Sequence, residues 1–130
     1  MMQTMLRVRL GEDNTHYPGG LIPAAYILRL FADCSGEIGI RMDGVDGYLA
    51  AYESAEFLKP VYAGDYLEVT AALIHKGNRS RKLHIEARRV IRAKDLGGGL
   101  SGGEALEEPE LVAKAVLIAV VPREYAGHAR

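Results

Sequence analysis

The pattern of apolar and polar residues predicts a strand followed by a long helix. Between positions 5 and 10, apolar residues alternate with two arginines, which is the period of a half-buried strand. Residues 11–20 contain a proline and several glycines and are expected to form a loop. From 22 to 42 the apolar residues cover nearly every side of a helix, with Pro23 suited to its first turn. A helix that is apolar on most sides is normally buried.

The remainder of the chain predicts four further strands. They are expected at residues 48–57, 66–75, 81–91 and 111–121. Within 81–91, apolar residues alternate with charged ones, which predicts one dry and one wet face. A glycine-rich segment at about 96–109 is expected to be a flexible loop, and about 122–130 a polar tail.

This order predicts one α+β domain over residues 1–130. A strand, a buried helix and four antiparallel strands fit a sheet wrapped around one long central helix, which is the hotdog fold. Such a sheet leaves edges that need cover. We therefore expect a homodimer, with a trimer of dimers as the larger assembly considered.

Composition narrows the function classes. The chain is 48% hydrophobic, enough for a real core, and its formal net charge is −1. This balance does not favour nucleic acid or an anionic membrane as a partner. The single cysteine, Cys34, fits a reducing compartment, and no apolar stretch approaches the length of a membrane span. The expected location is the cytoplasm.

Two motifs carry a resemblance to known proteins. His16-Tyr17-Pro18-Gly19, followed by Pro23-Ala24, is similar to the start of the central helix in 3-hydroxyacyl thioester dehydratases. The segment 56–65 is similar to the Phe-x-x-Pro-Val-x-x-Gly-Asp strand junction of hotdog dehydratases and thioesterases. Both motifs imply the hotdog fold.

A closer resemblance covers most of the chain. Segments 16–37, 51–65, 76–82 and 107–109 resemble the β-aminoacyl-CoA ammonia-lyases, hotdog enzymes that act on 3-aminobutyryl-CoA in lysine fermentation or on β-alanyl-CoA. The chain departs from that family at Asn14-Thr15, where Asp-Ala is expected. It also departs at Gly20 and Ala24, where Asn and Gly are expected. These positions lie in the substrate loop, so the acyl chain stays open.

Elimination of ammonia from a 3-aminoacyl-CoA needs a base, an acid and donors for the carbonyl oxygen. The free amides at the helix start, those of Ala24 and Ala25, are the predicted donors, because the helix dipole also favours negative charge there. Tyr17, Gly19 and Gly20 are the other predicted substrate contacts.

Four residues are candidates for acid and base. They are Asp33, Glu37, His16 and Glu56. In the dehydratases an acidic helix residue works with the loop histidine of the other subunit, but the aligned position here is Arg29. Asp33 and Glu37 follow on the same stripe of the helix, and burial at a subunit junction would raise their pKa values.

Each candidate also has a simpler interpretation. Arg29 with Asp33, and Glu37 with Arg41, have the spacing of ordinary ion pairs on a helix. His16 fits a loop residue that caps a turn, and Glu56 fits a solvent-facing position.

A basic turn is the predicted grip for the phosphates of CoA. Its residues are Lys76, Gly77, Asn78, Arg79, Ser80 and Arg81. Cations, a hydroxyl and free turn amides together suit phosphate oxygens, although a solvated basic turn would have the same composition. No metal site and no cofactor are expected beyond the CoA of the substrate itself.

The sequence therefore favours a lyase that acts on an acyl-CoA substrate. An acyl-CoA thioesterase with a carboxylate such as Asp33 as base or nucleophile is the alternative. A 2-enoyl-CoA hydratase and a non-catalytic acyl-CoA-binding protein are further alternatives, because one fold hosts all four.

Overall fold

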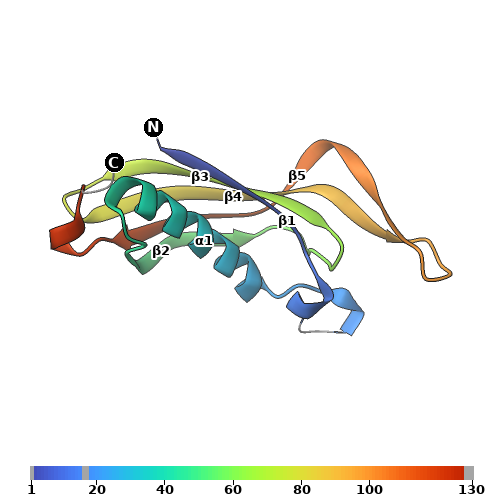
Figure 1. The fold of residues 1–130 in the computed structure, drawn as a ribbon. Helices are drawn as coiled ribbons and strands as arrows, with labels where there is room; N and C mark the ends of the chain where they lie inside the picture. The colour runs from blue at the N-terminus through green and yellow to red at the C-terminus, as the bar shows by residue number, and fades with distance from the viewer. Residues whose placement is uncertain (1, 16–17, 128–130) are drawn as a thin grey trace.

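A five-stranded antiparallel sheet curves around one long helix in the computed structural model (Figure 1). The structure describes residues 2–15 and 18–127. The strands lie in the order β1-β3-β4-β5-β2. Their bounds are Gln3–Arg9 for β1, Tyr48–Phe57 for β2, Tyr66–Lys76 for β3, Ser80–Asp95 for β4 and Ser101–Val120 for β5. The predicted hotdog fold is confirmed.

The central helix α1 spans Ala24–Asp43. Pro23 precedes it in an extended conformation, so the helix begins after the proline, slightly later than predicted. Gly44 ends it with a φ of 80°, and its N–H donates to the Ile40 carbonyl at 2.9 Å. Among the described residues, no helix is both long enough and apolar enough to cross a membrane.

The core lies between α1 and the concave face of the sheet. Leu83, Ile85 and Ala87 of β4 are buried there, while the residues between them are partly exposed, as the alternation predicts. Phe31 of α1 is fully buried against this face. The apolar side chains of the strands and those of the helix thus pack together in one core.

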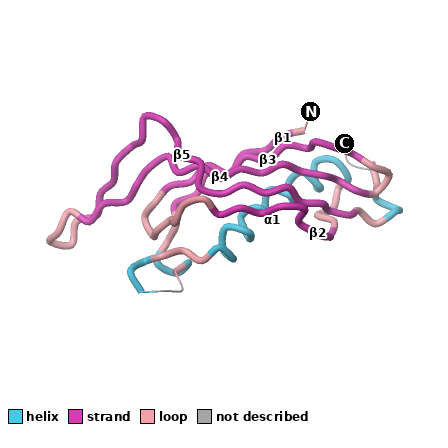
Figure 2. Tube along the Cα trace, turned by 180° about the vertical axis from the view of Figure 1, so that it is seen from behind, coloured by secondary structure: helices cyan, strands magenta, loops and turns pink. Residues whose placement is uncertain are grey.

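The predicted flexible loop at 96–109 is wrong over most of its length. Strand β5 already begins at Ser101 and pairs with β4 out to Asp95. The two strands form a hairpin arm, residues 92–108, that projects beyond the sheet (Figures 1 and 2). A Cβ at Gly103 would lie 2.8 Å from Ile91 Cγ2, and one at Gly102 2.7 Å from Leu96. These glycines permit close approach of the two strands.

The edge strand β2 is exposed along almost its whole length. Its two ends carry large apolar side chains, with Tyr48 71% and Phe57 45% exposed. A long apolar edge strand of this kind normally finds a partner.

The predicted polar tail contains a short 3₁₀ helix, η3, over Arg123–Tyr125. Beyond it, the Gly127 N–H donates to Asp43 Oδ1 at 2.7 Å. The tail is therefore attached to the end of α1.

Candidate active site

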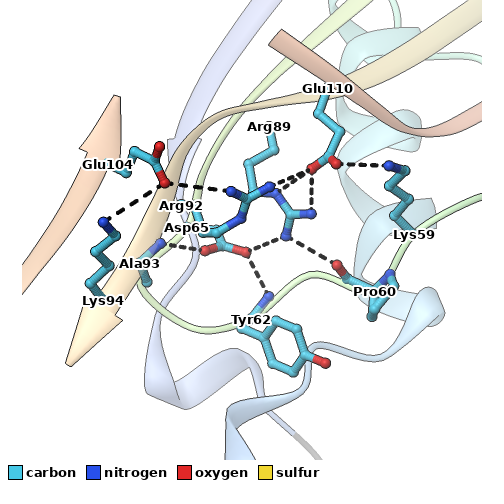
Figure 3. A network of polar contacts seen from close by, with 10 residues as sticks. All are labelled: Lys59, Pro60, Tyr62, Asp65, Arg89, Arg92, Ala93, Lys94, Glu104 and Glu110. Atoms are coloured by element: carbon cyan, nitrogen blue, oxygen red, sulfur yellow. Dashed lines mark hydrogen bonds and ion pairs between the residues drawn. The ribbon is translucent and has the colours of Figure 1, made fainter. Parts of the chain in front are cut away.

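The connection between β2 and β3, residues 58–65, passes the start of α1 and is held by Asp65. Oδ2 of this buried carboxylate accepts hydrogen bonds from the Tyr62 N–H and from Arg89, each at 2.9 Å (Figure 3). Oδ1 accepts the Ala93 N–H at 2.8 Å. Gly64, just before it, has a φ of 94°. The Gly-Asp pair of the motif thus fixes the shape of this junction.

An apolar cavity of about 240 Å³ lies between this junction and the start of α1. It is lined by Ile22, Ala24, Ile27, Phe57, Leu58, Lys59, Pro60, Val61, Val112 and Ala113. Within the described residues, no side chain caps the helix here. Ala24 and Ala25 are both exposed residues, and their amides lie in the first turn of a helix without a side-chain cap. The predicted oxyanion donors therefore lie beside a small apolar cavity.

The predicted substrate loop is attached to the same junction. A short 3₁₀ turn, η2, covers Pro18–Gly20, and Gly19 and Gly20 have φ values of 85° and 79°. The Ala63 N–H donates to the Gly20 carbonyl at 2.9 Å. Gly19 and Gly20 are thus close to the helix start. His16 and Tyr17, the other predicted residues of this loop, lie outside the described residues.

Asp33 and Glu37 line a different and larger groove, of about 770 Å³. Its other residues are Ala32, Ser35, Gly36, Ile40, Arg41, Asp46, Gly47 and Leu49. At a rise of about 1.5 Å per residue, Asp33 lies about 13 Å, and Glu37 about 20 Å, further along the helix axis than Ala24. Within one chain, the carboxylates and the helix amides therefore do not share a site.

The two helix carboxylates differ in their surroundings. Glu37 Oε2 accepts a hydrogen bond from Arg41 Nε at 2.9 Å. Hydrogen bonds from Thr4 and Arg41 hold the pKa of Glu37 below its ordinary value. The predicted Glu37–Arg41 pair is confirmed. The predicted rise in pKa concerned a carboxylate buried at a subunit junction, and it stays a prediction. Among the described residues, Asp33 forms no ion pair with Arg29.

Glu56 points away from the helix. It lies opposite Lys114 in the β2–β5 register, and the two side chains form an ion pair at 3.4 Å. Ala113 and Ala115, on either side of Lys114, are buried in the core. Because side chains alternate along a strand, Glu56 and Lys114 occupy the convex face. The predicted catalytic role of Glu56 does not fit this position.

The predicted CoA-binding turn, which joins β3 to β4, lies near the C-terminal end of α1, whereas Ala24 is at its N-terminal end (Figure 1). The turn adjoins the C-terminal end of α1, and a helix of 20 residues is about 30 Å long. Lys76, Asn78 and Arg79 are exposed, and Gly77 and Ser80 are half-buried. Arg79 Nε donates to the Val121 carbonyl at 2.9 Å.

Arg81 belongs to the interior and not to the turn surface. Its side chain is 2% exposed and donates to both carboxylate oxygens of Asp43, at 3.1 and 2.8 Å. It also donates to the Gly77 and Ser80 carbonyls. The prediction that Arg81 binds CoA directly is wrong, because the N–H donors of its guanidinium group bind acceptors inside the chain.

A second buried arginine, Arg89, was missed. It falls on the dry face of β4, in phase with Leu83, and a cation at such a position signals a buried carboxylate partner. It donates to Asp65, to Glu110 and to the Pro60 carbonyl (Figure 3). Hydrogen bonds from Lys59 and Arg89 lower the pKa of Glu110 to about 2. This network supports the junction beside the Ala24 cavity.

No group of three or more His, Cys, Asp or Glu side chains in the described part of the chain is arranged to hold a metal ion. The described walls of the Ala24 cavity offer free helix amides, apolar side chains and Lys59, and the helix carboxylates line the separate groove of Asp33.

Comparisons with known proteins agree with this geometry. Residues 24–94 match the family model described as the thioesterase superfamily. The chain is 40% identical over 124 residues to a 3-aminobutyryl-CoA ammonia lyase of Acetoanaerobium sticklandii, covering 95% of this chain and 97% of that protein.

Solved structures that are similar to this one include two ammonia-lyase or thioesterase examples. The β-alanyl-CoA:ammonia lyase of Clostridium propionicum has a TM-score of 0.89 and 25% identity, covering 96% of this chain and 88% of that one. A hexameric hotdog thioesterase of Campylobacter jejuni has a TM-score of 0.69 and 18% identity, covering 94% and 85%, and shows the fold alone. The chain therefore belongs to the thioesterase superfamily of hotdog proteins and, within it, to the β-aminoacyl-CoA ammonia-lyase family.

Proposed function

We propose that this protein is a lyase that eliminates ammonia from a 3-aminoacyl-CoA. The reaction would convert 3-aminobutyryl-CoA to crotonyl-CoA, or β-alanyl-CoA to acryloyl-CoA. Family membership supports the proposal, and one structural observation carries it: the uncapped start of α1 lies beside an apolar cavity of about 240 Å³. The substrate contains CoA, and the proposal requires no separate cofactor or metal.

The helix start would stabilise the charge that develops in the reaction. A base removes a proton from C2, and negative charge moves onto the thioester carbonyl oxygen. The amides of Ala24 and Ala25 and the helix dipole favour that charge. The electron pair then forms the C2–C3 double bond as the C3–N bond breaks, and the protonated nitrogen leaves as ammonia.

A homodimer through β2 would bring the carboxylates to this helix start. Phe57, at one end of β2, lines the Ala24 cavity, and Leu49, near the other end, lines the groove of Asp33. Antiparallel pairing of two β2 edges places the Phe57 end of one subunit beside the Leu49 end of its partner. Each site then combines the helix amides of one subunit with Asp33 of the partner subunit. Similar structures include hexameric thioesterases, and this likeness supports a trimer of dimers as the larger assembly.

Of the two groove carboxylates, Asp33 is the proposed proton carrier. Glu37 already accepts from Arg41 and Thr4, and these bonds keep its pKa low, so it suits a fixed anion. Asp33 is exposed in the groove and has no such partner among the described residues. His16 and Tyr17 remain proposed substrate contacts, and the cytoplasm the proposed location.

The test is turnover of crotonyl-CoA with and without ammonium. Loss of enoyl absorbance that depends on ammonium supports the lyase. Loss without ammonium indicates a hydratase, and release of free thiol indicates the thioesterase, which the exposed Asp33 would also suit. Saturable CoA binding without turnover indicates a binding protein.

The variants Asp33→Asn and Glu37→Gln distinguish the roles of the two carboxylates. Loss of a general acid or base costs about 100-fold or more in kcat, so we expect that loss for Asp33→Asn and a smaller one for Glu37→Gln. Size-exclusion chromatography should show both variants in the wild-type assembly. Full activity of Asp33→Asn would exclude it as the proton carrier.

A further inference from the structure

The nucleotide of CoA needs a site within reach of the Ala24 cavity. The basic turn at Lys76 lies near the C-terminal end of α1. It is therefore about one helix length, 30 Å, from Ala24 of the same chain. A second cavity is much nearer, because it shares the β2–β3 junction with the Ala24 cavity. Phe57 to Val61 line the Ala24 cavity, and Tyr62 to Gly64 line the second one.

This second cavity lies between the hairpin arm, the end of β1 and the junction. Its volume is about 730 Å³, within the usual range for pockets that hold small molecules. Its lining consists of Arg9, Leu10, Gly11, Glu12, Gly19, Tyr62, Ala63, Gly64, Ala93, Lys94, Asp95, Gly99, Leu100, Ser101 and Gly102. Gly19 also belongs to the loop predicted to contact substrate, so this cavity and the helix start share two segments.

The walls offer the groups that bind phosphate. Five of the lining residues are glycines. The Gly11 and Gly64 amides donate within the chain, to Asn14 Oδ1 and to the Leu10 carbonyl. Gly19 and Gly99 lie in turns with no described atom within 4 Å of a Cβ position, so a ligand can approach their backbone.

Two cations are among the lining residues, Arg9 at the end of β1 and Lys94 in the hairpin arm. The Arg9 guanidinium lies 5.4 Å from the centre of the Tyr66 ring, and Lys94 Nζ lies 3.8 Å from Glu104 at an exposed position.

Two carboxylates also line the cavity. Asp95 accepts the Gly97 N–H at 2.9 Å and is thereby turned toward its own hairpin. Glu12 is exposed at the rim. Neither forms an ion pair with Arg9 or Lys94 among the described residues, so no carboxylate of the lining neutralises these cations. Lys94 has its ion pair with Glu104, which is exposed and lies outside the lining.

An aromatic ring completes the cavity. Tyr62 is 42% exposed, and its ring points away from the Asp65 carboxylate that holds its backbone amide (Figure 3). An exposed ring on a fixed backbone suits stacking against a purine base.

We propose that this cavity binds the adenosine 3′-phosphate 5′-diphosphate part of CoA. The phosphates contact Arg9, Lys94 and the backbone at Gly19 and Gly99, and the adenine stacks on Tyr62. The inference rests on the proposed function in that the substrate is a CoA thioester. The grip for the nucleotide then comes from the same chain as the helix amides, and the basic turn at Lys76 is not needed for it.

The test compares two thioesters with the same acyl group, one of CoA and one of pantetheine, which lacks the nucleotide. We expect Arg9→Ala with Lys94→Ala to raise KM for the CoA thioester at least tenfold more than KM for the pantetheine thioester. The same pair should weaken inhibition by adenosine 3′,5′-bisphosphate by a similar factor. Lys76→Ala with Arg79→Ala removes the same charge at the competing site and should change the KM ratio less.

A KM ratio unchanged by the Arg9 and Lys94 substitutions, or changed as much by the Lys76 and Arg79 pair, would overturn the proposal. Titration of CoA itself into the folded protein by calorimetry separates this result from a failure of the lyase assignment. Without turnover of any 3-aminoacyl-CoA, weaker CoA binding in the Arg9 and Lys94 variant still supports the site. Undiminished CoA binding in that variant overturns it.

Discussion

Each end of the core is closed by a buried arginine of β4 paired with an aspartate, but the two pairs have different surroundings. Arg81 and Asp43 have side chains 2% and 0% exposed and form a closed pair at the C-terminal end of α1. Arg89 and Asp65, 7% and 2% exposed, are linked through Glu110 to Lys59 at the surface. The Arg81–Asp43 pair is thus closed to solvent, whereas the Arg89–Asp65 pair is connected to an exposed lysine.

The two aspartates also hold different parts of the chain. Asp43 accepts the Gly127 N–H and so attaches the C-terminal segment to the helix. Asp65 accepts the Tyr62 and Ala93 amides and fixes the junction beside both cavities. We infer that the first pair serves stability alone, whereas the second also positions the site.

The largest expected effect is that of Asp43→Ala on stability. It leaves Arg81 buried without a countercharge, which costs about 3–5 kcal/mol of unfolding free energy. Urea denaturation measures this loss. Replacing both partners, as in Asp43→Leu with Arg81→Met, should recover part of it, because no charge is then left buried, although the Gly127 N–H and the Gly77 and Ser80 carbonyls lose these bonds. A loss below about 1 kcal/mol for Asp43→Ala would show that water reaches Arg81.

Asp65→Ala should separate the two ends by activity. It leaves the Tyr62 and Ala93 amides and part of Arg89 unpaired, which costs about 1–3 kcal/mol. Because displacement of a site by about 1 Å can cost about 100-fold in rate, kcat/KM should also fall by up to that factor. Steady-state kinetics on the folded fraction measure this. Equal kcat/KM losses for Asp65→Ala and Asp43→Ala, per folded molecule, would remove the distinction between the ends.

Sequence reasoning succeeded where the signal is local. The order of elements, the apolar helix and the alternation in β4 follow from periods of 3.6 and 2. It did not predict the hairpin at Gly102 and Gly103. The sequence does not distinguish a glycine that allows two strands to approach closely from one that makes a loop flexible.

The two buried arginines show the limit of local patterns. Counting in steps of two from Leu83 places Arg81 and Arg89 on the dry face, but the partners that make burial tolerable are distant in sequence. Asp43 is 38 residues from Arg81, and Asp65 is 24 from Arg89. The separation of Asp33 from Ala24, by contrast, follows from nine residues of helix at about 1.5 Å each, so the sequence alone could have predicted it.

The open end should respond to acid through Glu110. Its pKa in the folded protein is about 2, against an ordinary value of 4.5, because Lys59 and Arg89 donate to it. A lowered pKa gives stability that is complete above about 4.5 and is lost as the pH falls toward 2. The difference in unfolding free energy between wild type and Glu110→Gln should therefore shrink across that window. A difference that stays constant from pH 6 to pH 3 would contradict the role of this carboxylate.

The smallest expected effect belongs to an ion pair that is neither sealed nor part of a network. Arg41 and Glu37 lie on the surface of α1, with side chains 61% and 41% exposed. Exposed pairs of this spacing contribute about 0.3–0.5 kcal/mol, because water already solvates both charges. Arg41→Ala should lower the unfolding free energy by about that amount, and the loss should vanish in 1 M salt, which screens exposed charges. Asp43→Ala should keep most of its loss under the same salt, because a pair at 2% and 0% exposure lies beyond the reach of mobile ions. If salt reduced the two losses equally, mobile ions would have to reach the Arg81–Asp43 pair, and the pair would not be buried in solution.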